Sequence, residues 1–200
     1  MNKTRRLLVL TLLSAVTVAG ISWAQYGRGY GRGYGRGYGR RTAMDADLSD
    51  PMNRNGVPVW DLGVEFKQDT FTFTRIQYTS YSDRGSNRDK WLTDFPDCDL
   101  NFSFRLQQLT SLEVDPKGKI LKLTDPNLLD YPFIYIIEPG HMYLMEDEVL
   151  GLRHYLENGG FLLVDDFWGE AEWYQFESQL NRIFPDRKWV ELPLEHEIFQ

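Results

Sequence analysis

The sequence contains one cysteine, Cys98, among its 200 residues. A single thiol cannot form a disulfide within the chain and cannot build a zinc site from several cysteines. The sequence also lacks the Gly-x-Ser-x-Gly turn of serine hydrolases and a glycine-rich loop of the kind that cradles phosphate groups. These absences argue against a serine hydrolase with that turn and against an enzyme that binds phosphate through a glycine-rich loop.

Residues 1–24 have the pattern of a secretory signal peptide. Basic residues precede an apolar stretch over residues 7–18, and a small-x-small cleavage site ends at Ala24. The apolar stretch is shorter than the roughly 20 residues of a membrane-spanning helix, which favours cleavage over an uncleaved anchor. We therefore expect an exported protein, periplasmic or extracellular, whose mature chain begins at Gln25.

Residues 25–41 repeat the tetrapeptide Gly-Arg-Gly-Tyr and carry five arginines. Glycine at every second position disfavours helices and strands, and no aliphatic side chain is available for a core. The following stretch is rich in Asp, Asn and Pro, so residues 25–56 are interpreted as a flexible tail and linker. They precede an acidic domain over residues 57–200.

The cationic tail suits an anionic partner. After export, this partner would be lipid headgroups, envelope polysaccharide or the acidic domain of the protein itself. Specific nucleic-acid binding is not expected in that compartment. The alternative is a solvated spacer without a partner.

Strand-like and helix-like patterns alternate in the domain, which predicts an α/β fold with a mainly parallel sheet and helices on both faces. The predicted strands cover residues 71–78, 120–123, 133–137, 161–164 and 188–192. The predicted helices begin near Asp97 and Glu146 and include the apolar stripe from Trp173 to Phe184. The continuous apolar runs at 133–137 and 161–164 are typical of strands that are buried on both faces.

Several motifs resemble the bacterial domain of unknown function 4159, from about Phe71 to the end of the chain. They are Phe73-x-Arg75-x-x-Tyr78, Trp91-x-Thr93-Asp94-x-Pro96 and Gly159-Gly160-Phe161-Leu162-x-x-Asp165-Asp166. The resemblance implies an exported or membrane-tethered protein without an assigned activity. It also implies the three-layer α/β/α, flavodoxin-like fold of class I glutamine amidotransferases, and a domain that is incomplete at its C-terminus.

The nucleophile of an amidotransferase is not found in the sequence. Cys98 lies in or beside a predicted helix with no glycine near it, so we interpret it as a small packing residue. The turn after the strand at 133–137 reads Glu138-Pro139-Gly140-His141 and contains no nucleophile. We therefore favour a noncatalytic binding or interaction module of the cell envelope over an enzyme.

A binding site is expected beyond the carboxyl ends of the strands, where open α/β sheets hold their ligands. Aromatic rings beside carboxylates suit a sugar-like or peptide ligand. The candidate ligand-binding residues are Tyr78, Trp91, Asp94, Glu138, His141 and Trp168.

The alternative function is a metal-assisted hydrolase. Asp165 and Asp166 follow one predicted strand, and Glu138 and His141 follow another, so the four side chains are expected to face one another. Such ligands suit Ca²⁺, Mg²⁺ or Mn²⁺, with Asp165 and Asp166 as the candidate metal ligands. No organic cofactor is predicted. Capping of the following helix is the competing role for these aspartates.

Overall fold

The computed structural model describes residues 47–63, 69–80 and 89–199, which belong to one unit of the chain. The predicted signal peptide and the Gly-Arg-Gly-Tyr repeat lie outside the described residues. Among the residues described, no helix has both the length and the hydropathy to cross a membrane.

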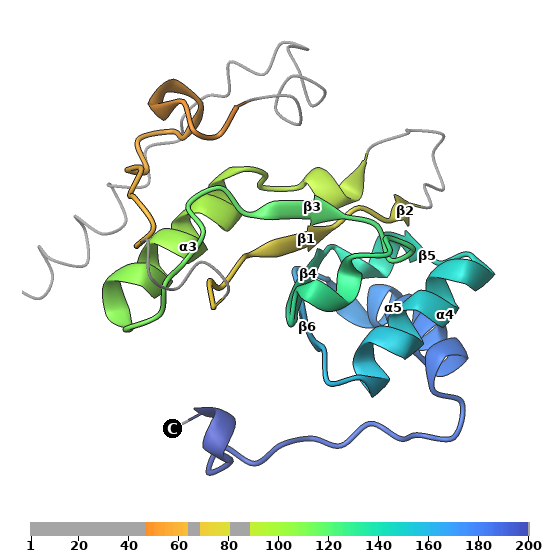
Figure 1. The fold of residues 1–200 in the computed structure, drawn as a ribbon. Coiled ribbons are helices and arrows are strands. Elements are labelled where there is room, and N and C mark those ends of the chain that lie inside the picture. Colours follow the sequence, from red (N-terminus) through yellow and green to blue (C-terminus); the bar gives the residue numbers. More distant parts are fainter. Residues whose placement is uncertain (1–46, 64–68, 81–88, 200) are drawn as a thin grey trace, which may run out of the picture. The chain divides into compact units, whose positions relative to one another are not determined.

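The central sheet has four parallel strands in the order β3-β1-β4-β6 (Figure 1). Their bounds are Thr74–Ile76 for β1, Lys119–Leu121 for β3, Phe133–Ile137 for β4 and Phe161–Asp165 for β6. A separate antiparallel pair joins β2 (Thr79–Ser80) to β5 (Met142–Tyr143). The predicted α/β class and mainly parallel sheet are confirmed.

In the described residues, three α-helices follow the expected pattern: α3 (Asp97–Leu109), α4 (Glu146–Glu157) and α5 (Gly169–Ile183). In α4, the carboxylate of Glu148 accepts a hydrogen bond from the backbone N–H of Met145 at 2.8 Å, which satisfies a donor at the helix start. Gly159, with φ of 90°, follows the end of α4 and takes the left-handed conformation that glycine adopts without strain.

Both faces of the sheet are covered. Side chains alternate along the central strand β4, so its residues pack into a different apolar cluster on each face. Ile134 and Ile136 pack with apolar residues of α4 and α5, whereas Tyr135 and Ile137 belong to a second cluster with Phe73 and Cys98, beside α3. This alternation explains why β4 is an uninterrupted apolar run. The predicted burial of residues 133–137 holds for all but Phe133, which is half-buried.

Arg75 lies at the centre of β1 and is fully buried. Its Nε atom is 3.0 Å from both carboxylate oxygens of Asp99 in α3, and its Nη1 atom donates to the carbonyl oxygens of Trp91 and Thr93 at 2.8 and 3.1 Å. The guanidinium also lies over the ring of Tyr135 in the next strand. These contacts connect β1 to α3 and to the turn that precedes it.

Two expectations about the later strands are wrong. The strand predicted over residues 161–164 is not buried on both faces: β6 pairs only with β4 among the described residues, and Phe161 is 48% exposed. Residues 188–192 form no strand. Trp189 instead packs on Trp173 and Phe176 with ring centroids 5.1 and 5.7 Å apart, so its side chain follows α5 rather than the sheet.

Residues 47–56, the described part of the segment expected to be a flexible linker, contact the domain through a buried arginine. Arg54 donates hydrogen bonds to the carbonyl oxygens of Val57, Leu48 and Pro116. Pro116 follows α3 in the sequence, so this contact holds the segment against the domain. A buried guanidinium needs such acceptors, and composition alone does not show where they lie.

The buried ion pair predicts a large effect of removing one partner. Asp99→Ala leaves the Arg75 guanidinium buried without its anion, and we expect a loss of about 3–5 kcal/mol in the free energy of unfolding. Urea denaturation measures this loss. Asp97→Ala is the matched control, because Asp97 is exposed in the same first turn of α3 and should cost about 1 kcal/mol or less. Equal losses in the two variants would contradict the prediction.

Candidate functional site

The chain changes direction across the sheet between β1 and β4. From β1 it passes to β3 on one side, and the later strands β4 and β6 lie on the other side. In open parallel sheets, such a switch point leaves a crevice at the carboxyl ends of the two central strands, where ligands bind. Tyr78 follows β1 and Glu138 follows β4 at this edge.

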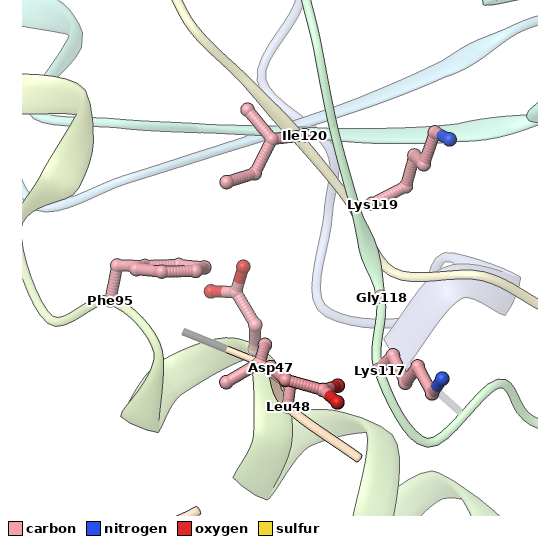
Figure 2. A pocket seen from close by; sticks show the side chains of 8 residues that line it. Asp47, Leu48, Phe95, Lys117, Gly118, Lys119 and Ile120 are labelled. Atoms are coloured by element: carbon pink, nitrogen blue, oxygen red, sulfur yellow. The ribbon is translucent and has the colours of Figure 1, made fainter. Parts of the chain in front are cut away.

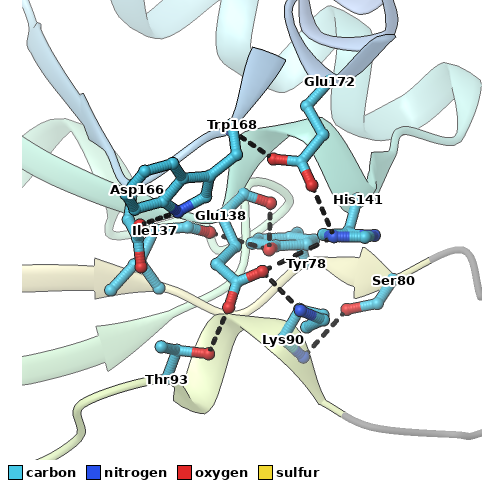
Figure 3. Close-up of polar contacts among 10 residues, drawn as sticks. All are labelled: Tyr78, Ser80, Lys90, Thr93, Ile137, Glu138, His141, Asp166, Trp168 and Glu172. Atoms are coloured by element: carbon cyan, nitrogen blue, oxygen red, sulfur yellow. Dashed lines mark hydrogen bonds and ion pairs between the residues drawn. The ribbon is translucent and has the colours of Figure 1, made fainter.

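Glu138 takes a left-handed backbone conformation directly after β4, with φ of 48° and ψ of 51°. This conformation is strained for a residue other than glycine. The backbone N–H of Glu138 donates to the carbonyl of Asp165 at 2.9 Å, and its carboxylate forms an ion pair with Lys90 and accepts from Thr93 Oγ1 at 3.1 Å (Figure 3). The strained residue is therefore held on both its backbone and its side chain.

His141 connects this carboxylate to α5. Its Nε2 atom is 3.5 Å from Glu138 Oε2 and 3.3 Å from Glu172 Oε1 (Figure 3). The turn that carries Glu138 and His141 packs closely against α5, since a Cβ atom on Gly140 would lie 2.3 Å from Glu172 Cβ. Glycine is therefore required at position 140 for the two carboxylates to share one imidazole.

We define the polar cluster as Lys90, Thr93, Glu138, His141 and Glu172. The side chains of its four ionisable members are 16–30% exposed. They are thus partly desolvated but reachable from solvent, which is the condition in which charged groups bind a ligand strongly. The cluster offers an ammonium, an imidazole, a hydroxyl and two carboxylates.

Tyr78 lies beneath the polar cluster rather than on its rim. It is buried, and its hydroxyl is 2.7 Å from the carbonyl oxygen of Ile137 and 2.9 Å from that of Glu138. Burial, and secondarily the negative charge of Glu138, raises the pKa of Tyr78. The phenol therefore remains a neutral donor that supports the strained backbone at Glu138.

Trp91 is also in the core and not on a rim. The short 3-10 turn Lys90–Leu92 directs Trp91 and Leu92 inward, whereas Lys90 and Thr93 reach Glu138. Lys90 directly precedes the Trp-x-Thr-Asp motif and Thr93 is its threonine, so the motif marks this segment in the sequence. Asp94 is exposed, with φ of 55°, and its carbonyl accepts from the backbone N–H of Cys98.

The structure brings Glu138 and His141 together as expected, but the two aspartates at the end of β6, Asp165 and Asp166, have other partners. Asp165 accepts from the hydroxyl of Tyr135 at 3.2 Å, and Asp166 accepts from the indole N–H of Trp168 at 2.8 Å. Within the part of the chain that the structure describes, no group of three or more His, Cys, Asp or Glu side chains is arranged to hold a metal ion.

Cys98 lies in the first turn of α3, half-buried, with its Sγ atom 3.6 Å from the hydroxyl of Tyr135. Burial raises the pKa of this thiol, so at neutral pH the nucleophilic thiolate is disfavoured. Its surroundings are those of a packing residue.

A cavity of about 330 Å³ lies elsewhere, between the segment at Asp47 and Leu48 and the start of β3 (Figure 2). The ring of Phe95 and the lysines Lys117 and Lys119 line it as well. Asp99 also reaches it, but the carboxylate of Asp99 is already occupied by Arg75. None of the lining residues belongs to the polar cluster.

The strands and the polar cluster define an α/β protein with a candidate site at the carboxyl edge of its central strands. Residues 72–200 match the model of a family described as Domain of unknown function (DUF4159). The chain therefore belongs to this family. No curated protein matches the sequence.

The support that Tyr78 gives to Glu138 is testable with the smallest possible change. Tyr78→Phe leaves two partly buried carbonyl groups without this donor, and we expect a loss of about 1–3 kcal/mol in the free energy of unfolding. Chemical denaturation measures it. Tyr174→Phe is the control, because Tyr174 is exposed on α5. If both variants unfold at the same denaturant concentration as the parent protein, Tyr78 does not support this edge of the sheet.

Proposed function

We propose that this protein is a noncatalytic binding module of the cell envelope, whose ligand occupies the polar cluster. The observation that carries the proposal is the strained backbone of Glu138 at the switch point of the sheet. Strain of this kind concentrates at functional sites, where it places a side chain that an unstrained backbone would not place. Lys90 and Thr93 reach that side chain from the turn before α3, and His141 reaches it from the end of the turn that Glu138 begins.

We also propose that the domain has the flavodoxin-like, three-layer α/β/α architecture of class I glutamine amidotransferases. When the strands of the parallel sheet are numbered along the chain, their order is 2-1-3-4, which agrees with the first four strands of the flavodoxin-like order. The packing of α3 on one face and of α4 and α5 on the other supports the same architecture.

The polar cluster favours binding over catalysis. Its hydroxyl, on Thr93, donates to the Glu138 carboxylate, which already forms an ion pair with Lys90. In the turn after β4, where an amidotransferase would carry its nucleophile, the strained residue is a glutamate. The cluster therefore holds donors and acceptors without an activated nucleophile.

The alternative, a metal-assisted hydrolase that uses Asp165, Asp166 and His141, receives less support. The carboxylates of both aspartates accept hydrogen bonds from neighbouring side chains, and Asp165 also accepts from the backbone N–H of Asp166. These contacts are those of residues that shape a loop.

Binding at the polar cluster is tested by a matched pair of glutamate variants. A ligand that occupies the cluster should bind Glu138→Gln at least about tenfold more weakly, because the variant keeps the shape but loses the charge. Glu157→Gln, at the end of α4, should bind as the parent does. Isothermal titration with soluble oligosaccharides and with short peptides measures both. A ligand that binds the parent and Glu138→Gln equally would place the binding site elsewhere.

Export by a cleaved signal peptide belongs to the same proposal, with the cationic tail free to contact anionic envelope polymers or lipid headgroups. We expect secreted or periplasmic protein to begin at Gln25, as measured by intact mass. Ala24→Trp should block cleavage, because the site requires a small residue there. Recovery of the parent protein with Met1 still attached would contradict the proposal.

A further inference from the structure

Trp168 is held in a fixed position although it is not buried. The residue lies between β6 and α5, and it is 77% exposed. Its backbone N–H donates to Glu172 Oε2 at 2.6 Å, and its indole N–H donates to Asp166 Oδ1 at 2.8 Å (Figure 3). These two hydrogen bonds restrict the indole while leaving most of its surface in water.

The backbone at Asp166 supports this arrangement at an energetic cost. Asp166 has φ of 61°, a left-handed conformation that costs about 1–3 kcal/mol for a residue other than glycine. An exposed indole removes little apolar surface from water, so it does not offset that cost through burial. The stability of the core therefore does not account for the position of Trp168.

The indole and the polar cluster belong to one surface. Glu172 accepts from the Trp168 backbone and also contacts His141, and the backbone N–H of Glu138 donates to the carbonyl of Asp165. Trp168 is thus linked to the polar cluster through Glu172, and Figure 3 draws both at the carboxyl edge of the sheet.

We propose that Trp168 is a stacking platform for a pyranose ring of an oligosaccharide or polysaccharide, and that the polar cluster binds the hydroxyl groups of that sugar. This inference rests on the proposed binding function and names the class of ligand. A pyranose has an apolar face of C–H groups, which suits a flat aromatic ring. Its hydroxyls both donate and accept, and the cluster offers the donor Lys90 and the acceptors Glu138 and Glu172.

An extended peptide fits this edge less well. A peptide that binds mainly through its backbone needs unpaired backbone groups on the protein. The carbonyl oxygens of Ile137 and Glu138 already accept from Tyr78, and the N–H of Glu138 is bound to Asp165. Side-chain groups and an aromatic face remain, which is the composition that a sugar requires.

The experiment uses the mature chain and isothermal titration with β-1,4-linked hexasaccharides of glucose, mannose and N-acetylglucosamine. We expect at least one of them to bind. Trp168→Ala should weaken that binding about tenfold or more, and Trp168→Phe should retain part of it. Trp189→Ala is the matched control, because Trp189 is also partly exposed but packs on Trp173. A cooperative thermal transition well above the assay temperature establishes that each variant is folded.

The outcomes separate this inference from the proposal on which it rests. If no hexasaccharide binds, or if Trp168→Ala binds as the parent does, the sugar platform is overturned. In that case, binding of an alanine-lysine hexapeptide that Glu138→Gln weakens would keep the polar cluster as a binding site for a different ligand. If Glu138→Gln weakens no ligand that the parent binds, both proposals fail.

Discussion

The ion pair between Arg75 and Asp99 is the constraint on which the centre of this domain depends. A guanidinium in the middle of a buried strand is tolerated only if its donors find acceptors, because an unpaired buried charge is far costlier than an unpaired neutral group. Asp99 supplies its carboxylate from α3, and the carbonyl groups of Trp91 and Thr93 complete the set. The pair therefore determines where α3 and the preceding turn sit against β1.

The same ion pair also positions residues of the candidate site. Since the carbonyl groups of Trp91 and Thr93 are bound to Arg75, the turn between them has one orientation, with the Trp91 ring in the core. In that orientation, Lys90 and Thr93 reach the carboxylate of Glu138. A buried contact on the α3 face of the sheet thus positions polar groups at its carboxyl edge. Loss of the ion pair should disturb the packing of α3 and also the position of Lys90 and Thr93.

The sequence predicts the elements of this fold better than it predicts their surroundings. The alternation of apolar runs and helical stripes is a local property, so the strand at 133–137 and the three helices are correct. Burial of residues 161–164 and pairing of residues 188–192 depend on which strands are neighbours, and a hydrophobic pattern does not contain that information. Both predictions are wrong for this reason.

The sequence likewise predicts some features of the candidate site and not others. Its location follows from the topology of parallel strands, and the pairing of Glu138 with His141 follows from their spacing of three residues in the turn after β4. The roles of the aromatic residues do not, since a tryptophan in a polar loop can point in either direction. The structure puts Trp91 inside and Trp168 outside. Glu172 could not be inferred, because it meets His141 only through a tertiary contact. Lys90 directly precedes the Trp-x-Thr-Asp motif, but the motif does not show that it meets Glu138.

Glu138 and Asp166 show why this edge of the sheet differs from an ordinary set of loops. Each directly follows a strand, and each has a left-handed backbone in which glycine would be unstrained. Glycine would relieve about 1–3 kcal/mol at either position, an appreciable part of the roughly 5–15 kcal/mol that stabilises a domain. A glycine would also remove the carboxylate that pairs with Lys90 or the one that holds the indole of Trp168. The two strained positions are therefore explained by the groups that their carboxylates hold in place at this edge of the sheet.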